Sequence, residues 1–101
     1  MRTRCLLIVY KGFHMDQVID YLNVLSYQTR SVLSVLDISL TETQILVENI
    51  VQIRRLLTRW KKYETSLGQN NQLATSINDL IVKYFELEGM AKEQRNRLIS
   101  Q

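Results

Sequence analysis

Residues 73–91 read LATSINDLIVKYFELEGMA, and the apolar positions in this stretch recur with the period of an α-helix. Steps of four and three residues separate six of them, namely Leu73, Ile77, Leu80, Tyr84, Leu87 and Ala91. Such spacing places all six on one stripe of a helix, and that stripe needs an apolar partner to cover it. The chain has no proline and only three glycines in 101 residues, so it lacks most of the residues that tight turns between strands require. We therefore predict an all-α fold.

Two more helices are predicted before this one. The first covers about residues 16–36, where one stripe contains Val18, Leu22, Leu25, Thr29, Val32 and Leu36. Ser39 and Glu42 have the spacing of a capping box, in which each side chain accepts a hydrogen bond from a free backbone N–H, so a second helix is predicted over about 40–67. Gly68 suits the left-handed residue that follows a helix, and a polar turn at 69–71 leads into a third helix over about 72–98.

The second predicted helix has the broadest apolar surface. Its central stripe is flanked on both sides by further aliphatic residues, and the whole set is Ile45, Leu46, Val47, Ile50, Val51, Ile53, Leu56, Leu57 and Trp60. This breadth favours a middle helix with neighbours on two flanks. Because the links are short, we predict an antiparallel three-helix bundle, or a long helical hairpin completed by dimerisation, with residues 15–101 as a single helical domain.

Residues 1–14 do not share the helical period. A β-prone apolar run at 5–10 ends at Lys11 and Gly12, and a lone strand has no partner in this sequence. Three interpretations stay open: a helix or strand that packs against the helical body, a segment that docks on a partner, and a frayed N-terminal leader.

Charge is distributed unevenly between the N-terminus and the rest of the chain. The net charge is +3, and Arg2, Arg4 and Lys11 precede the first acid, Asp16. From Asp16 onward there are ten basic and ten acidic residues, so the predicted helical body is neutral. A nucleic-acid-binding domain usually gathers a basic excess on one face, so the net charge is weak support for that function.

The single cysteine, Cys5, cannot form an internal disulfide, which indicates a reducing compartment. No apolar run approaches the ~20 residues that a membrane span requires. We expect a cytoplasmic protein with no membrane span.

Candidate catalytic groups are isolated from one another. His14 is the only histidine and Cys5 is the only cysteine. The sequence therefore lacks the additional ligands that a metal site would need and the neighbouring groups that a catalytic triad would need. Glu86 and Glu88 point to different sides of a helix, and Glu88 with Lys92 has the spacing of an ordinary ion pair. The sequence also lacks E-x-x-H, a glycine-rich phosphate loop and G-x-S-x-G. We predict that the protein is not an enzyme and uses no metal or cofactor.

Two apolar residues of the third helix, Val82 and Phe85, point away from its main stripe, with Ile81 between the two faces and Gly89 one turn beyond Phe85. Either another part of the chain covers them or they form a patch for a partner protein or a second copy. Gly89 would permit close backbone approach at such a contact. The predicted partner-binding residues are therefore Ile81, Val82, Phe85 and Gly89.

A basic row on the second helix offers a different function. Arg55, Arg59 and Lys62 share one stripe opposite the apolar seam, whereas Trp60 belongs to the seam. Three aligned cations can hold phosphates, and a solvated outer face has the same pattern.

Residues 74–84, ATSINDLIVKY, resemble the S-Q-E-L-D-x-L-I-x-x-Y stretch of the small helical-hairpin phosphatases that act on sporulation response regulators. Those hairpins also have a loop about where 68–71 lies. Here Asn78 stands at the position of the family's signature aspartate, and Thr75 and Ser76 replace its Gln-Glu pair. The resemblance rests mainly on Leu, Ile and Tyr positions and assigns no membership. Small flagellar and type III export chaperones are similar in their long, proline-poor helices, which is a likeness of architecture alone.

From these patterns we expect a noncatalytic adaptor, chaperone or regulator that presents a helix face to another protein or to a second copy of itself. The alternative is a small nucleic-acid-associated regulator that uses Arg55, Arg59 and Lys62.

Overall fold

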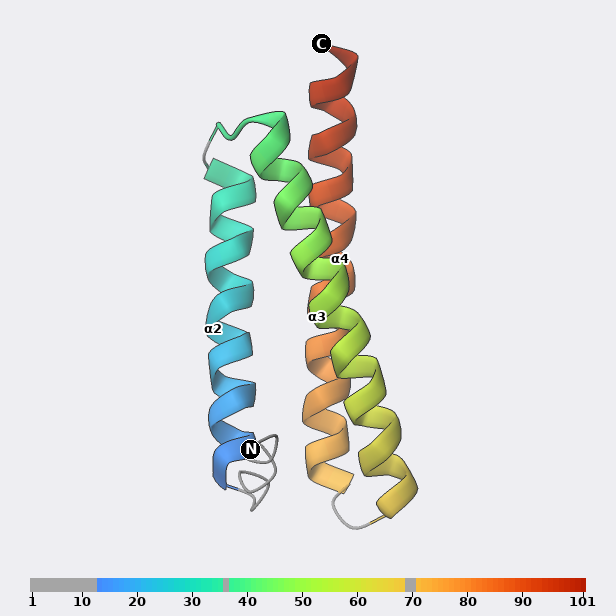
Figure 1. Cartoon of the computed structure of the whole chain (residues 1–101). Helices are drawn as coiled ribbons and strands as arrows, with labels where there is room; N and C mark the ends of the chain where they lie inside the picture. The colour runs from blue at the N-terminus through green and yellow to red at the C-terminus, as the bar shows by residue number, and fades with distance from the viewer. Residues whose placement is uncertain (1–12, 36, 69–70) are drawn as a thin grey trace, which may run out of the picture.

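A computed structural model describes residues 13–35, 37–68 and 71–101. This part of the chain forms three helices, whose arrangement is drawn in Figure 1. They are α2 (Phe13–Val35), α3 (Leu40–Leu67) and α4 (Asn71–Ser100), and none of the residues described lies in a strand. The predicted all-α fold is confirmed, and the arrangement is that of a three-helix bundle. The apolar run at 5–10, with Lys11 and Gly12, falls outside the described residues.

The helix boundaries agree closely with the predicted ones. The second helix has the predicted bounds, whereas α2 begins at Phe13 rather than near 16, and α4 runs on to Ser100 rather than ending near 98. Residues 13 and 14 therefore form the start of α2.

Both predicted caps of α3 are present. The Glu42 N–H donates to the Ser39 hydroxyl at 3.1 Å, and the Ser39 N–H donates to the Glu42 carboxylate at 2.9 Å. The bond from the Ser39 backbone, with the one from its side chain, lowers the pKa of Glu42 below its ordinary value. Gly68 has φ 64° and donates its N–H to the Glu64 carbonyl, the left-handed ending that favours glycine.

The central helix is α4. Both α2 and α3 pack on α4, whereas α2 and α3 do not pack on each other within the part of the chain that the structure describes. In Figure 1 α3 crosses α4 at a slant and diverges from α2 toward its C-terminal end. The expectation that residues 40–67 form the middle helix is therefore wrong, because α4 is the one helix among the described residues on which α3 packs.

The core is built on the apolar stripe of α4 predicted from the sequence, which extends from Leu73 to Ala91. All six of its members are buried, and they meet Val47, Ile50 and Leu57 of α3 and Leu33 of α2. The fully buried side chains thus come mostly from α4 and α3.

The rotation of α2 differs from the predicted one. Its contact side contains Ile19, Leu22 and the buried pair Ser26 and Leu33, whereas Val18, placed in the predicted stripe, is 45% exposed. Two neighbouring apolar rows run along this helix, and the contact with α4 selects one of them. Nothing local to α2 distinguishes the two rows.

Candidate partner-binding faces

One side of the molecule carries two matching apolar rows, which we call the α2–α3 face. Val18, Leu25 and Val32 form the row on α2, and Leu46, Ile53 and Trp60 form the row on α3. Members of each row are seven residues apart, so they recur on the same side of their helix. Val18 is exposed and the other five are half-buried.

The orientation of the α3 row follows from the hydrogen bonds to α4. Ile53 is followed by Arg54, which bonds to Glu88, and Trp60 is followed by Lys61, which bonds to Asn78. Because successive helical residues are turned by about 100°, the row lies on the flank of α3 opposite these bonds. That flank is directed toward the side where α2 lies.

The α2 row is placed by the same reasoning. The Lys83 ammonium of α4 donates to the Asn23 amide oxygen at 2.6 Å, on the far flank of α2 from Val18 and Leu25. The two rows therefore flank α4 on one side of the molecule. Exposed Tyr21 and Leu56 widen this surface at its edges.

The sequence pattern shows both rows but does not show that they form one face. It predicted that the α3 row belongs to the seam of its helix, and Leu46, Ile53 and Trp60 are indeed partly buried against the core. It placed the α2 row in one stripe together with Leu22. The signal that identifies a face is the pairing of two heptad-spaced rows on helices that share one neighbour and do not approach each other closely through their backbones. That relation is a tertiary one, so the sequence does not contain it.

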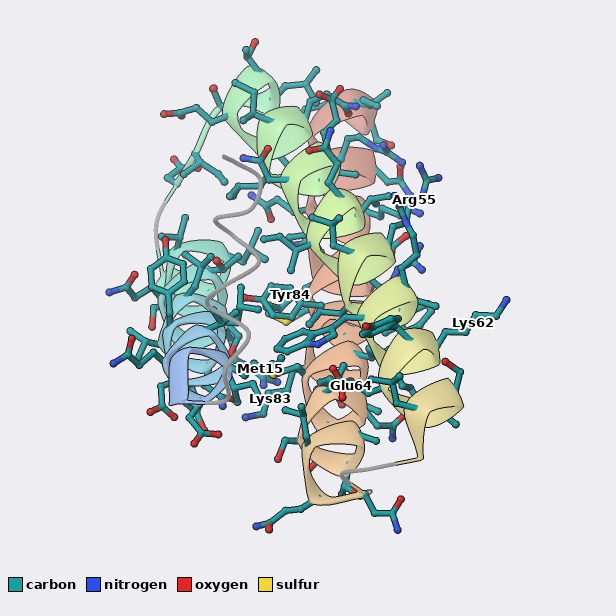
Figure 2. The ribbon with its side chains drawn as sticks, turned by 60° about the horizontal axis from the view of Figure 1, so that its bottom comes forward. Met15, Arg55, Lys62, Glu64, Lys83 and Tyr84 are labelled. Atoms are coloured by element: carbon teal, nitrogen blue, oxygen red, sulfur yellow. The ribbon has the colours of Figure 1, made fainter. Side chains whose placement is uncertain are left out.

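A buried carboxylate lies at the C-terminal end of the α3 row. Glu64 is 6% exposed, and one of its oxygens, Oε2, accepts a hydrogen bond from the Trp60 indole N–H at 3.2 Å. Figure 2 shows Glu64, together with Met15 and Tyr84, on the side of the molecule where α2 and α3 face each other across α4. No described cation forms an ion pair with this carboxylate.

Tyr84 joins α2 to α4. Its hydroxyl donates to the Leu22 carbonyl oxygen at 2.7 Å, and its ring is almost completely buried. Burial, with a smaller contribution from Tyr21, raises the pKa of the Tyr84 phenol to about 12. The neighbouring Lys83 ammonium lies 5.3 Å from the centre of the Tyr27 ring.

The structure separates the four residues predicted to bind a partner. Ile81 is buried in the core, so its place in an accessible patch is a wrong prediction. Val82 and Phe85 are exposed, and the Arg54 guanidinium lies 4.3 Å from the Phe85 ring centre. A Cβ added at Gly89 would meet nothing within 4 Å, so no close backbone approach occurs there among the described residues.

An ion-pair network lies beside this patch. Glu88 accepts hydrogen bonds from Arg54 Nε at 2.6 Å and Lys92 Nζ at 2.7 Å. The bond from Lys92, together with Arg54, lowers the pKa of Glu88, and partial burial opposes this shift. The pair with Lys92 is the predicted one, whereas Arg54 is 34 residues away in sequence and no local spacing indicates it.

The predicted basic row lies on the outer side of α3. Arg55, Arg59 and Lys62 are all exposed, and Figure 2 shows Arg55 and Lys62 pointing away from α2. Within the part of the chain that the structure describes, none of the three forms an ion pair. The geometry suits phosphate contacts, and nucleic-acid binding stays a prediction.

Residues 13–35, 37–68 and 71–101 contain no cluster of histidine, cysteine and acidic side chains that could hold a metal ion. None of the helices in these ranges has the length and apolar character that crossing a bilayer requires. Comparisons with protein-family models, with curated proteins and with solved structures give no match. The residues described above are therefore the basis for any functional proposal.

Proposed function

We propose that this chain is a noncatalytic cytoplasmic binding protein, an adaptor, chaperone or regulator, whose α2–α3 face accepts an amphipathic helix of another protein. The observation that carries the proposal is that α2 and α3 pack on α4 but not on each other, while each directs a heptad-spaced apolar row to the same side.

The expected occupant follows from the spacing of the two rows. A helix with apolar residues at alternating steps of three and four would present one stripe, and each row offers a matching residue every seven positions. With such a helix lying over α4, the three helices and the occupant would form a four-helix bundle. Covering a fully exposed aliphatic side chain contributes about 1.5–3 kcal/mol, and the half-buried members of the rows would gain only part of this. Because association also costs several kcal/mol, binding needs most of both rows together.

A second candidate function rests on the basic row. Arg55, Arg59 and Lys62 form no ion pair with a described acid, as a phosphate-binding row requires. The ten acids among residues 16–101 balance the ten basic residues there, so any binding of DNA or RNA should be weak, nonspecific and lost as salt is raised. Sequence-specific binding that survives ~200 mM salt would favour this candidate over the first.

The α2–α3 face can be tested with two valines of the same helix. Val18 belongs to the face and is 45% exposed, whereas Val24 points outward and is 54% exposed. The bait is the full chain, and the probe is a displayed library of three-heptad peptides with leucine at the stripe positions and the remaining positions randomised. Trp60 is the only tryptophan and lies on the face, so its fluorescence reports an occupant directly.

We expect selected peptides to shift Trp60 emission to shorter wavelength and to lose at least tenfold in affinity for Val18→Asp, because a carboxylate would be buried without a partner. Val24→Asp should bind as the unchanged chain does. Equal loss in both variants, or binding that Val82→Asp abolishes instead, would place the binding site elsewhere.

A further inference from the structure

Glu64 indicates which kind of helix the α2–α3 face accepts, if the function proposed above holds. Glu64 is only 6% exposed, and its carboxylate accepts one hydrogen bond from a side chain, the indole N–H of Trp60. A carboxylate removed from water is stable only when charged partners or several donors satisfy it. One neutral indole N–H supplies a small part of that requirement.

The two basic residues nearest to Glu64 in the sequence, Lys61 and Lys62, do not pair with it. The Lys61 ammonium donates to the Asn78 amide at 2.8 Å on the α4 side of α3, and Lys62 points away from α2. Glu88 shows the contrast within the same molecule, because a buried carboxylate there holds both Arg54 and Lys92. Among the described residues, Glu64 is thus a buried acid that has no cation.

Glu64 also lies where an occupant would pass. It lies one helical turn beyond Trp60, the last member of the α3 row, and seven residues after the core residue Leu57. Glu64 is therefore at the core-side edge of the row, at the end of the face where α3 has diverged from α2. A side chain of the occupant's terminal turn would reach it.

We propose that the partner helix carries a lysine or arginine in a terminal turn, and that this cation pairs with Glu64 beside the Trp60 ring. The pair would add a charge-assisted hydrogen bond to the carboxylate and a contact between the cation and the indole face. Leucine-type anchors along the rest of the helix would supply apolar contact, whereas the single cation would fix its direction and register.

The experiment repeats the peptide selection with full randomisation of both terminal turns. Baits are the unchanged chain, Glu64→Gln, which keeps the shape and an acceptor for Trp60, and Glu48→Gln, which removes an exposed carboxylate of the same helix. We expect lysine or arginine to be enriched at one terminal position with the unchanged chain and with Glu48→Gln, but not with Glu64→Gln. Binding of a selected peptide, measured by the anisotropy of a label on the peptide, should fall about tenfold or more for Glu64→Gln.

A change on the peptide makes the test independent of protein folding. Replacing the enriched cation by norleucine should weaken binding to the unchanged chain by the same factor and leave binding to Glu64→Gln unaltered. Selected peptides without an enriched cation, or with equal enrichment for Glu64→Gln, would overturn this inference and leave the proposed function intact. Recovery of no binding peptide from any bait would contradict the proposed function itself.

Discussion

Tyr84 of α4 forms a hydrogen bond that joins α4 to α2. Its ring is buried in the core of the bundle, and its hydroxyl donates to the backbone carbonyl of Leu22 in α2. One side chain therefore contributes both apolar burial and an inter-helix hydrogen bond. The sequence places Tyr84 in the apolar stripe, but it gives no indication of the acceptor, which is 62 residues away.

Tyr84→Phe should lower the free energy of unfolding by about 0.5–1.5 kcal/mol, the usual net contribution of a hydrogen bond. The ring stays, so the core should not collapse. Tyr63→Phe is the control, because Tyr63 is exposed. Urea denaturation followed by circular dichroism measures both variants, and equal stability of the two would show that the bond to Leu22 contributes nothing.

The same pair of variants gives a pH test. Because the folded pKa of Tyr84 is raised to about 12 from an ordinary value of 10.0, its contribution is complete below pH ~10 and is lost as pH rises toward ~12. The unchanged chain should therefore lose stability between about pH 10 and about pH 12 more steeply than Tyr84→Phe does. An identical alkaline slope in both would mean that Tyr84 is not buried as described.

Individual helices have two kinds of apolar surface, and α3 shows the difference most clearly. Leu57 is 2% exposed in the core, whereas the adjacent Leu56 is 60% exposed at the edge of the α2–α3 face. In the sequence both belong to one broad stripe. The breadth that predicted two helical neighbours instead provides one side packed on α4 and one side whose residues range from half-buried to exposed.

Leu57→Ala should lower the free energy of unfolding by about 2–5 kcal/mol, as expected for a buried large-to-small change. Leu56→Ala should stay within about 0.5 kcal/mol, since its side chain is already in contact with water. Thermal melts of the two variants measure the difference. A large loss for Leu56→Ala would show that α3 is rotated or that the α2–α3 face is covered in the isolated chain.

At the scale of the whole molecule, the patch of Val82 and Phe85 lies outside the shared core. Phe85 is 53% exposed beneath the Arg54 guanidinium, whereas the neighbouring Ile81 is buried. The interpretation that another part of the chain covers Val82 and Phe85 is therefore wrong for these two residues, because both are about half exposed. The patch is a second apolar surface, separate from the α2–α3 face.

Phe85→Asp should leave helicity and the free energy of unfolding nearly unchanged, within about 0.5 kcal/mol, because the charge stays in water. Ile81→Asp should abolish cooperative melting, since it places a carboxylate in the core. Circular dichroism melts separate these outcomes, and light scattering shows whether Phe85→Asp also removes self-association. If the Phe85→Asp chain unfolds, Phe85 is a core residue and the patch is not an exposed surface.

Features that depend on residues close together in the chain could be predicted from the sequence. The capping box of Ser39 and Glu42, the left-handed Gly68 and the buried stripe of α4 all arise from bonds or periodicities within a few turns. In contrast, the central place of α4, the choice of the buried row on α2 and the bond from Arg54 to Glu88 are visible only in the folded arrangement. Helices with more than one apolar row can pack in several rotations of similar local energy, and only contacts between distant residues select one of them.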